Sequence, residues 1–246
     1  MLFRDRREAG RRLAARLADR QRSGQLESPV VLALPRGGVP VADEIARTLH
    51  APLDVLVVRK IGAPFNRELG IGALAGEDPP LYDERALTLL GLAPDRLAAQ
   101  VARERAELRR REALYRGGRP APELRGRSVV LVDDGLATGV TARAALRAVR
   151  AMEPSLVLLA APVCSDQAAT ALDAEADDLL CLHRPRHFEA VGQWYEDFTQ
   201  VRDDEVLAVL SAARQERDST DGAADADGAG GTHGAQGAAE GRRRDG

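Results

Sequence analysis

Segments rich in apolar residues alternate along the chain with segments that show helical periodicity. Apolar runs of this kind are typical of strands buried on both faces, as in a parallel sheet. They occur at 30–34, 53–58, 129–132, 156–163 and 178–182. Helical patterns lie between them, at about 41–49, 142–150 and 166–172. The alternation predicts an α/β fold with a doubly wound, mainly parallel sheet.

The stretch between the second and third predicted strands interrupts this alternation. Residues 63–80 are rich in Gly and Pro and lack clear periodicity, which predicts a mobile lid with one small hairpin strand at about 69–75. Two helices are expected after it, at 83–90 and 94–115. Residues from about 63 to 120 should therefore form a lid and hood beside the sheet.

The two ends of the chain have compositions of their own. Residues 3–20 are rich in Arg and Ala with acidic residues between them, which predicts a solvated helix over one edge of the domain. A last short helix is expected at 203–213. Beyond about Gln215 the chain has almost no large apolar residue, which predicts disorder. We expect one folded domain over residues 1–213 and a disordered, low-complexity tail over 214–246.

Candidate chemistry begins at the carboxyl end of the 129–132 strand. Two adjacent carboxylates, Asp133 and Asp134, stand there. A loop of small and hydroxyl residues follows and leads into a helix: Gly135, Leu136, Ala137, Thr138, Gly139, Val140 and Thr141. The free N–H groups at a helix start bind phosphate well. Because the carboxylates would repel a bare phosphate, the combination favours a ligand that also carries hydroxyls, such as a sugar phosphate.

Basic residues follow two other predicted strands. Arg36, Gly37 and Gly38 follow the first strand, and the glycines let the backbone approach a ligand while Arg36 offers a fork-shaped cation. Arg59 and Lys60 follow the second strand. Lys60 is the only lysine in a chain with 35 basic residues, which suggests a specific need for a compact ammonium group. Since parallel strands end at one rim of a sheet, we expect these loops to meet the carboxylates.

These motifs together resemble the type I phosphoribosyltransferases. The resemblance rests on the strand, acidic pair and Thr-Gly-Val-Thr loop at 129–141, on Leu-Pro-Arg-Gly-Gly-Val-Pro at 34–40 and on Val-Arg-Lys-Ile-Gly at 58–62. Phe-x-Asp-Arg near the start and Val-Gly-Gln-Trp-Tyr-Glu-Asp-Phe at 191–198 add to it. This combination is similar to a group of predicted bacterial phosphoribosyltransferases whose substrate is unsettled.

The resemblance implies an activity and a set of roles. It implies a pentosyltransferase that binds phosphoribosyl pyrophosphate (PRPP) with Mg²⁺ and moves ribose 5-phosphate to a nitrogen acceptor, usually a nucleobase, with release of pyrophosphate. The loop 135–141 would hold the 5′-phosphate, and Asp133 and Asp134 the ribose hydroxyls. The pyrophosphate would be held by Arg36, Gly37, Gly38, Arg59 and Lys60.

Four of these residues would be catalytic: Lys60, Asp133, Asp134 and Arg36. Mg²⁺ would be held mainly through PRPP and water, with Asp133 and Asp134 the side chains that could reach it. In these relatives the loop after the first strand often contains a non-proline cis peptide, which the resemblance places at Arg36–Gly37.

The segment 188–198 gathers several of the chain's few aromatic residues, at an overall aromatic content of 3%. One interpretation is a small apolar cluster packed on the sheet edge. The other is a platform on which a base stacks, with Phe188, Trp194 and Tyr195 as candidates. The sequence leaves both interpretations open.

Composition limits the partners. A net charge of −3 supplies no bulk attraction for nucleic acid or a membrane, and no run is apolar enough to span one. Cys164 and Cys181 are interpreted as buried free thiols, and a cytoplasmic location follows as the default. Gly70–Ala75 matches a dinucleotide-binding pattern but lacks the strand before it, so we reject that interpretation. A homodimer is compatible with the fold.

Two alternative functions follow from the same residues. One is a regulator that senses PRPP or a nucleotide and acts by binding alone, although the acidic balance gives it no basic nucleic-acid surface. The other is a generic nucleotide-binding α/β domain, which leaves the Asp133–Asp134 pair unexplained.

Overall fold

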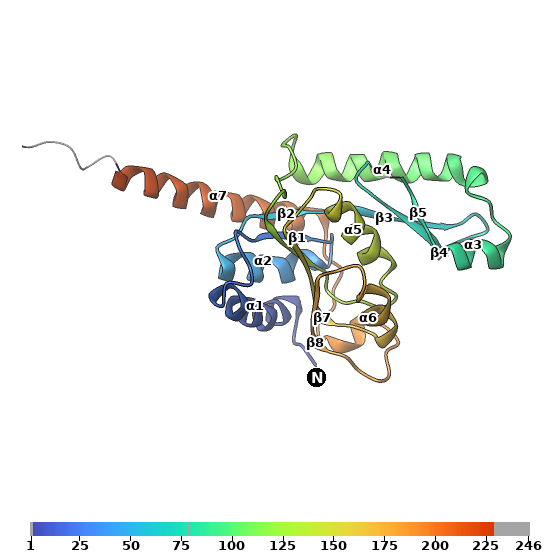
Figure 1. The fold of residues 1–246 in the computed structure, drawn as a ribbon, viewed down its shortest axis with the longest axis horizontal. Helices are drawn as coiled ribbons and strands as arrows, with labels where there is room; N and C mark the ends of the chain where they lie inside the picture. The colour runs from blue at the N-terminus through green and yellow to red at the C-terminus, as the bar shows by residue number, and fades with distance from the viewer. Residues whose placement is uncertain (1, 78, 229–246) are drawn as a thin grey trace, which may run out of the picture.

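The central feature of the fold is a sheet of five parallel strands. The computed structural model describes residues 2–77 and 79–228. In spatial order the strands are β2 (Leu53–Val55), β1 (Val30–Ala33), β6 (Ser128–Val132), β7 (Leu156–Val163) and β8 (Asp178–His183). Every neighbouring pair is parallel. The predicted α/β fold with a mainly parallel sheet is confirmed (Figure 1).

Helices cover both faces of this sheet (Figure 1). One face packs against α1 (Arg6–Arg22), α2 (Gly38–Leu49) and the first part of α7 (Asp203–Gly228). The other packs against α5 (Val140–Arg150) and α6 (Asp166–Leu172). Alternate residues of β1, β6, β7 and β8 serve the two cores, because successive side chains of a strand point to opposite faces.

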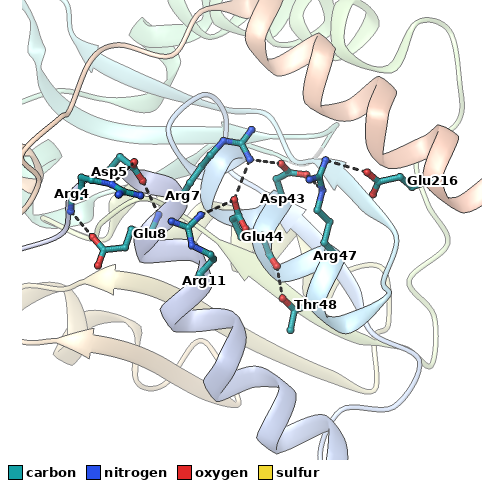
Figure 2. A network of polar contacts seen from close by, with 10 residues as sticks. All are labelled: Arg4, Asp5, Arg7, Glu8, Arg11, Asp43, Glu44, Arg47, Thr48 and Glu216. Carbon is teal, nitrogen blue, oxygen red and sulfur yellow. Dashed lines mark hydrogen bonds and ion pairs between the residues drawn. The ribbon is translucent and has the colours of Figure 1, made fainter.

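The arginines of α1 fasten that helix to α2 (Figure 2). Arg7 lies 2.9 Å from a carboxylate oxygen of Asp43 and 3.2 Å from Glu44, and Arg11 lies 3.3 Å from Glu44. Arg47 pairs with Asp43 on its own helix at 3.2 Å. Asp43 is almost fully buried, so its charge requires these partners. The Arg-rich face of α1 therefore serves contacts within the chain.

A second, smaller sheet forms the base of the hood. It contains the antiparallel strands β3 (Val58–Ala63), β4 (Asn66–Ala75) and β5 (Leu81–Tyr82). The helices α3 (Glu84–Leu90) and α4 (Ala98–Arg116), with a short 3-10 turn η1 (Pro94–Leu97) between them, complete it. Figure 1 shows this unit projecting to one side of the central sheet, with α4 lying along it.

The structure of the hood differs from two of the sequence predictions. The strand expected at 53–58 divides: β2 ends at Val55 and β3 starts at Val58, in the other sheet. Residues 66–75 are one continuous strand, with register shifts in its pairing with β3, although 63–80 showed no clear periodicity. The hairpin strand expected at 69–75 is confirmed and starts earlier, at Asn66. Gly70 and Gly72 lie inside it, which agrees with the rejection of the dinucleotide pattern.

The chain start pairs with the segment after β8, and the last described helix extends further than the sequence predicts. The Phe3 N–H donates to the Trp194 carbonyl, and the Glu196 N–H to the Phe3 carbonyl, both at 2.8 Å. The segment after β8, which includes the 3-10 turn η2 (Val191–Trp194), is thereby held beside the chain start. Helix α7 continues to Gly228, so residues 214–228 are helical where disorder was expected. The rest of that predicted tail, 229–246, lies outside the described residues.

The strands β1 and β6 are neighbours in the sheet, and they place two loops side by side. Ala33 pairs with Val132 in register, so both strands end at the same level. The chain leaves β1 for a helix on one face and β6 for a helix on the other, which makes this a topological switch point. Here Gly38 lies against the backbone of β6.

We predict that Gly38→Ala destabilises the protein. A Cβ there would lie 2.6 Å from the Val132 carbonyl oxygen and 3.2 Å from the Asp133 Cα, so backbone must move. The expected loss is about 1–3 kcal/mol of unfolding free energy, measured by urea denaturation. Gly70→Ala is the matched control, since its nearest neighbour, at 3.2 Å, is the flexible Lys60 side chain. Equal losses in the two variants would contradict the close approach at Gly38.

Candidate phosphate and carboxylate site

Hydrogen bonds to β7 and to Ser165 hold the first half of the loop between β6 and α5, and its second half leads into the helix. The Leu136 N–H donates to the Val163 carbonyl, and the Ser165 N–H to the Leu136 carbonyl, both at 2.9 Å. The Ser165 hydroxyl donates to the Ala137 carbonyl. Gly139 then adopts φ +75° and starts α5 without a side-chain cap. The helix N-terminus is thereby left for an external anion.

Thr138, Gly139, Val140 and Thr141 line a cavity of about 1340 Å³. The hood supplies the opposite wall, with Lys60, Gly70 and Tyr82 among its residues. Helices α5 and α6 add the cations Arg143 and Arg147 and the polar side chains Gln167 and Thr170. The cavity therefore joins a helix N-terminus, two threonine hydroxyls and four cations, which suit a phosphorylated ligand, with three carboxylates: Asp83, Glu84 and Asp166.

Lys60 and Arg59 point to different places, because neighbouring residues of a strand face opposite sides. Lys60 lines the cavity from β3. Arg59 forms an ion pair with Glu104 of α4, with its Nε and Nη2 atoms 3.0 and 2.6 Å from the same carboxylate oxygen. Both residues belong to the hood sheet and not to the rim of the central sheet, which corrects the expected position. Lys60, and not Arg59, thus lines the same cavity as residues 138–141 of the candidate phosphate loop, the segment 135–141.

The carboxylates Asp133 and Asp134 lie at the end of β6, beside the loop after β1. A Cβ on Gly37 would come within 2.0 Å of the Asp134 Oδ2 atom, so the two loops touch. Burial and the adjacent Asp134 charge raise the pKa of Asp133 well above its usual range. Burial also raises the pKa of Asp134, against the opposing effect of the Arg6 charge.

Arg36 joins this site through its backbone more than through its side chain. The Nη1 atom of Arg36 lies 4.0 Å from Asp203 at the start of α7. Tyr115, from the end of α4, donates its hydroxyl to the same carboxylate. The cis peptide expected at Arg36–Gly37 is instead Pro35–Arg36. The loop after β1 thus presents Gly37 and Gly38 to the carboxylates, while the guanidinium is paired with α7.

The aromatic segment after β8 packs mainly within the protein. Tyr195 is 6% exposed, and its ring lies 5.6 Å from Phe3 and 5.1 Å from Phe198 between centroids. Its hydroxyl donates to the Asp134 carbonyl at 2.6 Å. Trp194 packs on His183 at 4.8 Å, and Phe188 is half-buried. These contacts favour the apolar-cluster interpretation for Tyr195 over a base platform.

Sequence reasoning missed one residue of this site, Arg6. Its Nε atom donates to the Asp134 Oδ2 atom at 2.8 Å, from the first turn of α1. The only signal was its position in the Phe-x-Asp-Arg motif near the start of the chain. Nothing in a sequence pattern shows that residues 6 and 134 touch.

The described ranges, 2–77 and 79–228, contain no group of three or more His, Cys, Asp or Glu side chains placed to hold a metal ion. None of their helices combines the length and apolarity that crossing a membrane requires. Cys164 and Cys181 are both free, as expected; Cys164 is buried and Cys181 half-buried.

The fold and the site define an α/β protein with a candidate phosphate loop and an acidic pair at a topological switch point. A family model described as "Phosphoribosyl transferase domain" matches residues 5–199. The chain therefore belongs to the phosphoribosyl transferase domain family. This confirms the resemblance drawn from its motifs.

Individual relatives agree with this assignment. The chain is 46% identical over 215 residues to "Putative phosphoribosyl transferase MT0597" of Mycobacterium tuberculosis (strain CDC 1551 / Oshkosh), and equally to the protein named Rv0571c of strain ATCC 25618 / H37Rv. These matches cover 87% of this chain but 48% of either relative, so the chain spans about half their length.

A solved structure is similar over most of both chains. The crystal structure of TT1426 from Thermus thermophilus shares 46% sequence identity with this chain and superposes with a TM-score of 0.72. The match covers 85% of this chain and 98% of that one.

We predict that Ser165→Ala weakens the support of the phosphate loop. Its hydroxyl oxygen accepts the Ala168 N–H at 3.0 Å as the cap of α6, and its hydroxyl donates to Ala137. The expected cost is about 1–2 kcal/mol of unfolding free energy in urea.

Thr48→Ala is the control, because that exposed hydroxyl bonds only the Glu44 carbonyl of its own helix. We expect a change within about 0.5 kcal/mol there. A Ser165→Ala variant as stable as Thr48→Ala would show that the hydroxyl does not support the loop.

Proposed function

We propose that this protein binds PRPP with Mg²⁺ and transfers its ribose 5-phosphate group to a nitrogen acceptor, with release of pyrophosphate. The observation that carries the proposal is one cavity lined both by the loop Thr138–Thr141 and by Lys60; the acidic pair lies outside that lining, at the end of the strand before the loop. Membership of the phosphoribosyl transferase family supports the class of reaction. A nucleobase is the acceptor that this family membership favours.

Each part of PRPP has a matching group. The 5′-phosphate would accept hydrogen bonds from the amides and hydroxyls of Thr138–Thr141 at the α5 N-terminus. Ribose hydroxyls would donate to the carboxylates at the end of β6. The pyrophosphate would meet the Lys60 ammonium and the amide of Gly37, whereas the Gly38 N–H donates to the Leu34 carbonyl at 3.0 Å. A phosphate, a diol and a second anionic group therefore each find donors or acceptors of the correct sign.

Catalysis in this arrangement depends on positioning and on charge. The bond between C1 of the ribose and the pyrophosphate oxygen breaks while the acceptor nitrogen bonds to C1, and positive charge develops on the ribose ring. Carboxylate charge near the ring would stabilise it, and Lys60 would stabilise the departing pyrophosphate. The hood, which forms the wall opposite the phosphate loop, would exclude water from C1.

The residues present fit Mg²⁺ held through the substrate rather than by a protein cage. Mg²⁺ prefers oxygen ligands and keeps several waters. Asp133 and Asp134 are the carboxylates at the rim, and Arg6 already occupies one oxygen of Asp134. Asp133, whose carboxylate has no arginine bonded to it among the described residues, would therefore be the carboxylate more available to the ion, directly or through water. When bound, the ion would neutralise charge on the pyrophosphate.

We predict that Lys60→Ala lowers kcat/KM for pyrophosphate release by about a hundredfold or more, because it removes a donor to the leaving group. The assay uses PRPP, Mg²⁺ and a panel of purine and pyrimidine bases. Arg103→Ala, an exposed cation on the same hood, is the control and should retain wild-type rates. Release that depends on one base supports transfer, and binding of PRPP without release supports a sensor. Wild-type turnover in Lys60→Ala would remove Lys60 from the mechanism.

A binding measurement that needs no acceptor uses the single lysine of the chain. Reductive methylation with ¹³C-formaldehyde labels Lys60 and the chain's amino terminus, and Lys60→Ala assigns the two signals. We predict that adding PRPP with Mg²⁺, or pyrophosphate with Mg²⁺, shifts the Lys60 signal and leaves the terminal signal in place. An unchanged Lys60 signal at saturating PRPP would contradict the proposed position of the pyrophosphate.

A further inference from the structure

Arg6 is a buried arginine in the first turn of the N-terminal helix. Only 9% of the residue is exposed. Its Nε atom donates to Asp134 Oδ2 at 2.8 Å, and its Nη1 atom donates to the Thr199 carbonyl at the same distance. The guanidinium also lies 3.9 Å from the centroid of the Phe198 ring. Arg6 thus connects the chain start and the segment after β8 to the acidic pair.

Asp134 is enclosed on the side that Arg6 occupies. Its side chain is 14% exposed, and its Oδ2 atom faces the backbone of Gly37 as well as Arg6. The Tyr195 hydroxyl holds the Asp134 carbonyl at 2.6 Å. The Asp134 N–H donates to the Asp133 carboxylate at 2.9 Å. Both the side chain and the backbone of Asp134 are therefore engaged by the protein.

Burial makes the Arg6–Asp134 pair interdependent. A charge taken out of water requires a partner, and removal of one partner leaves the other uncompensated. With Arg6 present, the Asp134 carboxylate can rest against Gly37 in the loop after β1. Without it, a buried carboxylate would turn toward solvent or take up a proton, and its contact with that loop would be lost.

We infer that Arg6 is a positioning residue and that the two carboxylates have different tasks. Arg6 holds Asp134 against the loop 36–38 and thereby sets the distance between this loop and the end of β6. Asp134 acts as an anchor within the protein, and Asp133 is the carboxylate left for the ribose hydroxyls. The second task rests on the proposed function, whereas the first concerns the ligand-free protein.

Amide hydrogen exchange of the ligand-free full chain tests the positioning. We expect Arg6→Ala to speed exchange at least about tenfold in residues 36–38 and 133–135, because the loops lose their common anchor. Arg6→Lys keeps a cation near Asp134 and should stay within about threefold of wild type in the same segments. Arg11→Ala, which removes an exposed arginine of the same helix, should change neither segment.

If Arg6→Ala does not fold, Arg6→Gln takes its place, since it keeps an N–H donor and loses the charge. Exchange in residues 36–38 and 133–135 that is the same in the neutral Arg6 variant as in Arg11→Ala would overturn the inference.

Calorimetry with PRPP and Mg²⁺ tests the division of tasks. We expect Asp133→Asn and Arg6→Ala each to raise the PRPP Kd at least about tenfold, and Asp134→Asn less than about threefold. In Arg6→Ala/Asp134→Asn the Kd should return toward that of wild type, because a neutral amide needs no counter-charge. Asp133→Asn should raise the Kd by the same factor in either background.

The outcomes separate the two proposals. Equal losses from Asp133→Asn and Asp134→Asn, with additive effects in the double variant, would make Asp134 a ribose ligand and overturn the inference. No binding of PRPP by the wild-type protein would contradict the proposed function. In that case the exchange experiment still decides whether Arg6 positions the two loops.

Discussion

The parallel pairing of β1 with β6 is the constraint on which the rest of the site depends. Because Ala33 and Val132 are in register, the loops after both strands begin at the same level and leave toward opposite faces. Contact between the loops then requires a residue without a side chain, and Gly37 and Gly38 meet this requirement. The same junction supplies the phosphate loop, since α5 starts a few residues after the carboxylates.

Hydrogen bonds to Asp134 connect this junction to distant parts of the chain. Arg6 of α1 bonds to Asp134, and Tyr195 after β8 bonds to the carbonyl of the same residue. The chain start and the segment 194–197 are hydrogen-bonded to each other as well. The aromatic segment therefore supports the acidic pair through the Tyr195 hydroxyl, which bonds to the Asp134 backbone. This contact gives the cluster of rings a structural explanation. An aromatic residue of this segment can therefore lie beside the candidate site without contacting a ligand.

The accuracy of the sequence predictions follows the locality of the forces involved. The strand at 156–163 and the helix at 166–172 have the predicted bounds, because a long apolar run and a serine cap are local signals. The hood was mispredicted at 53–63, because an apolar run does not show where a chain leaves one sheet for another. β3 exists as a strand through its pairing with β4, and that partner lies in a Gly-rich stretch.

The sequence by itself determined the α/β class and the position of two loops at strand ends, the loop of small and hydroxyl residues after 129–132 and the glycine loop after 30–33. These depend on composition and spacing within a dozen residues, which a linear pattern contains. Only the tertiary structure decided which charged side chains meet: Lys60 lies at the phosphate cavity, Arg59 pairs with Glu104, and Arg6 pairs with Asp134. The physical reason is that ion pairing depends on distances of a few ångströms between residues up to 128 positions apart, and such distances arise only when the sheets and helices pack.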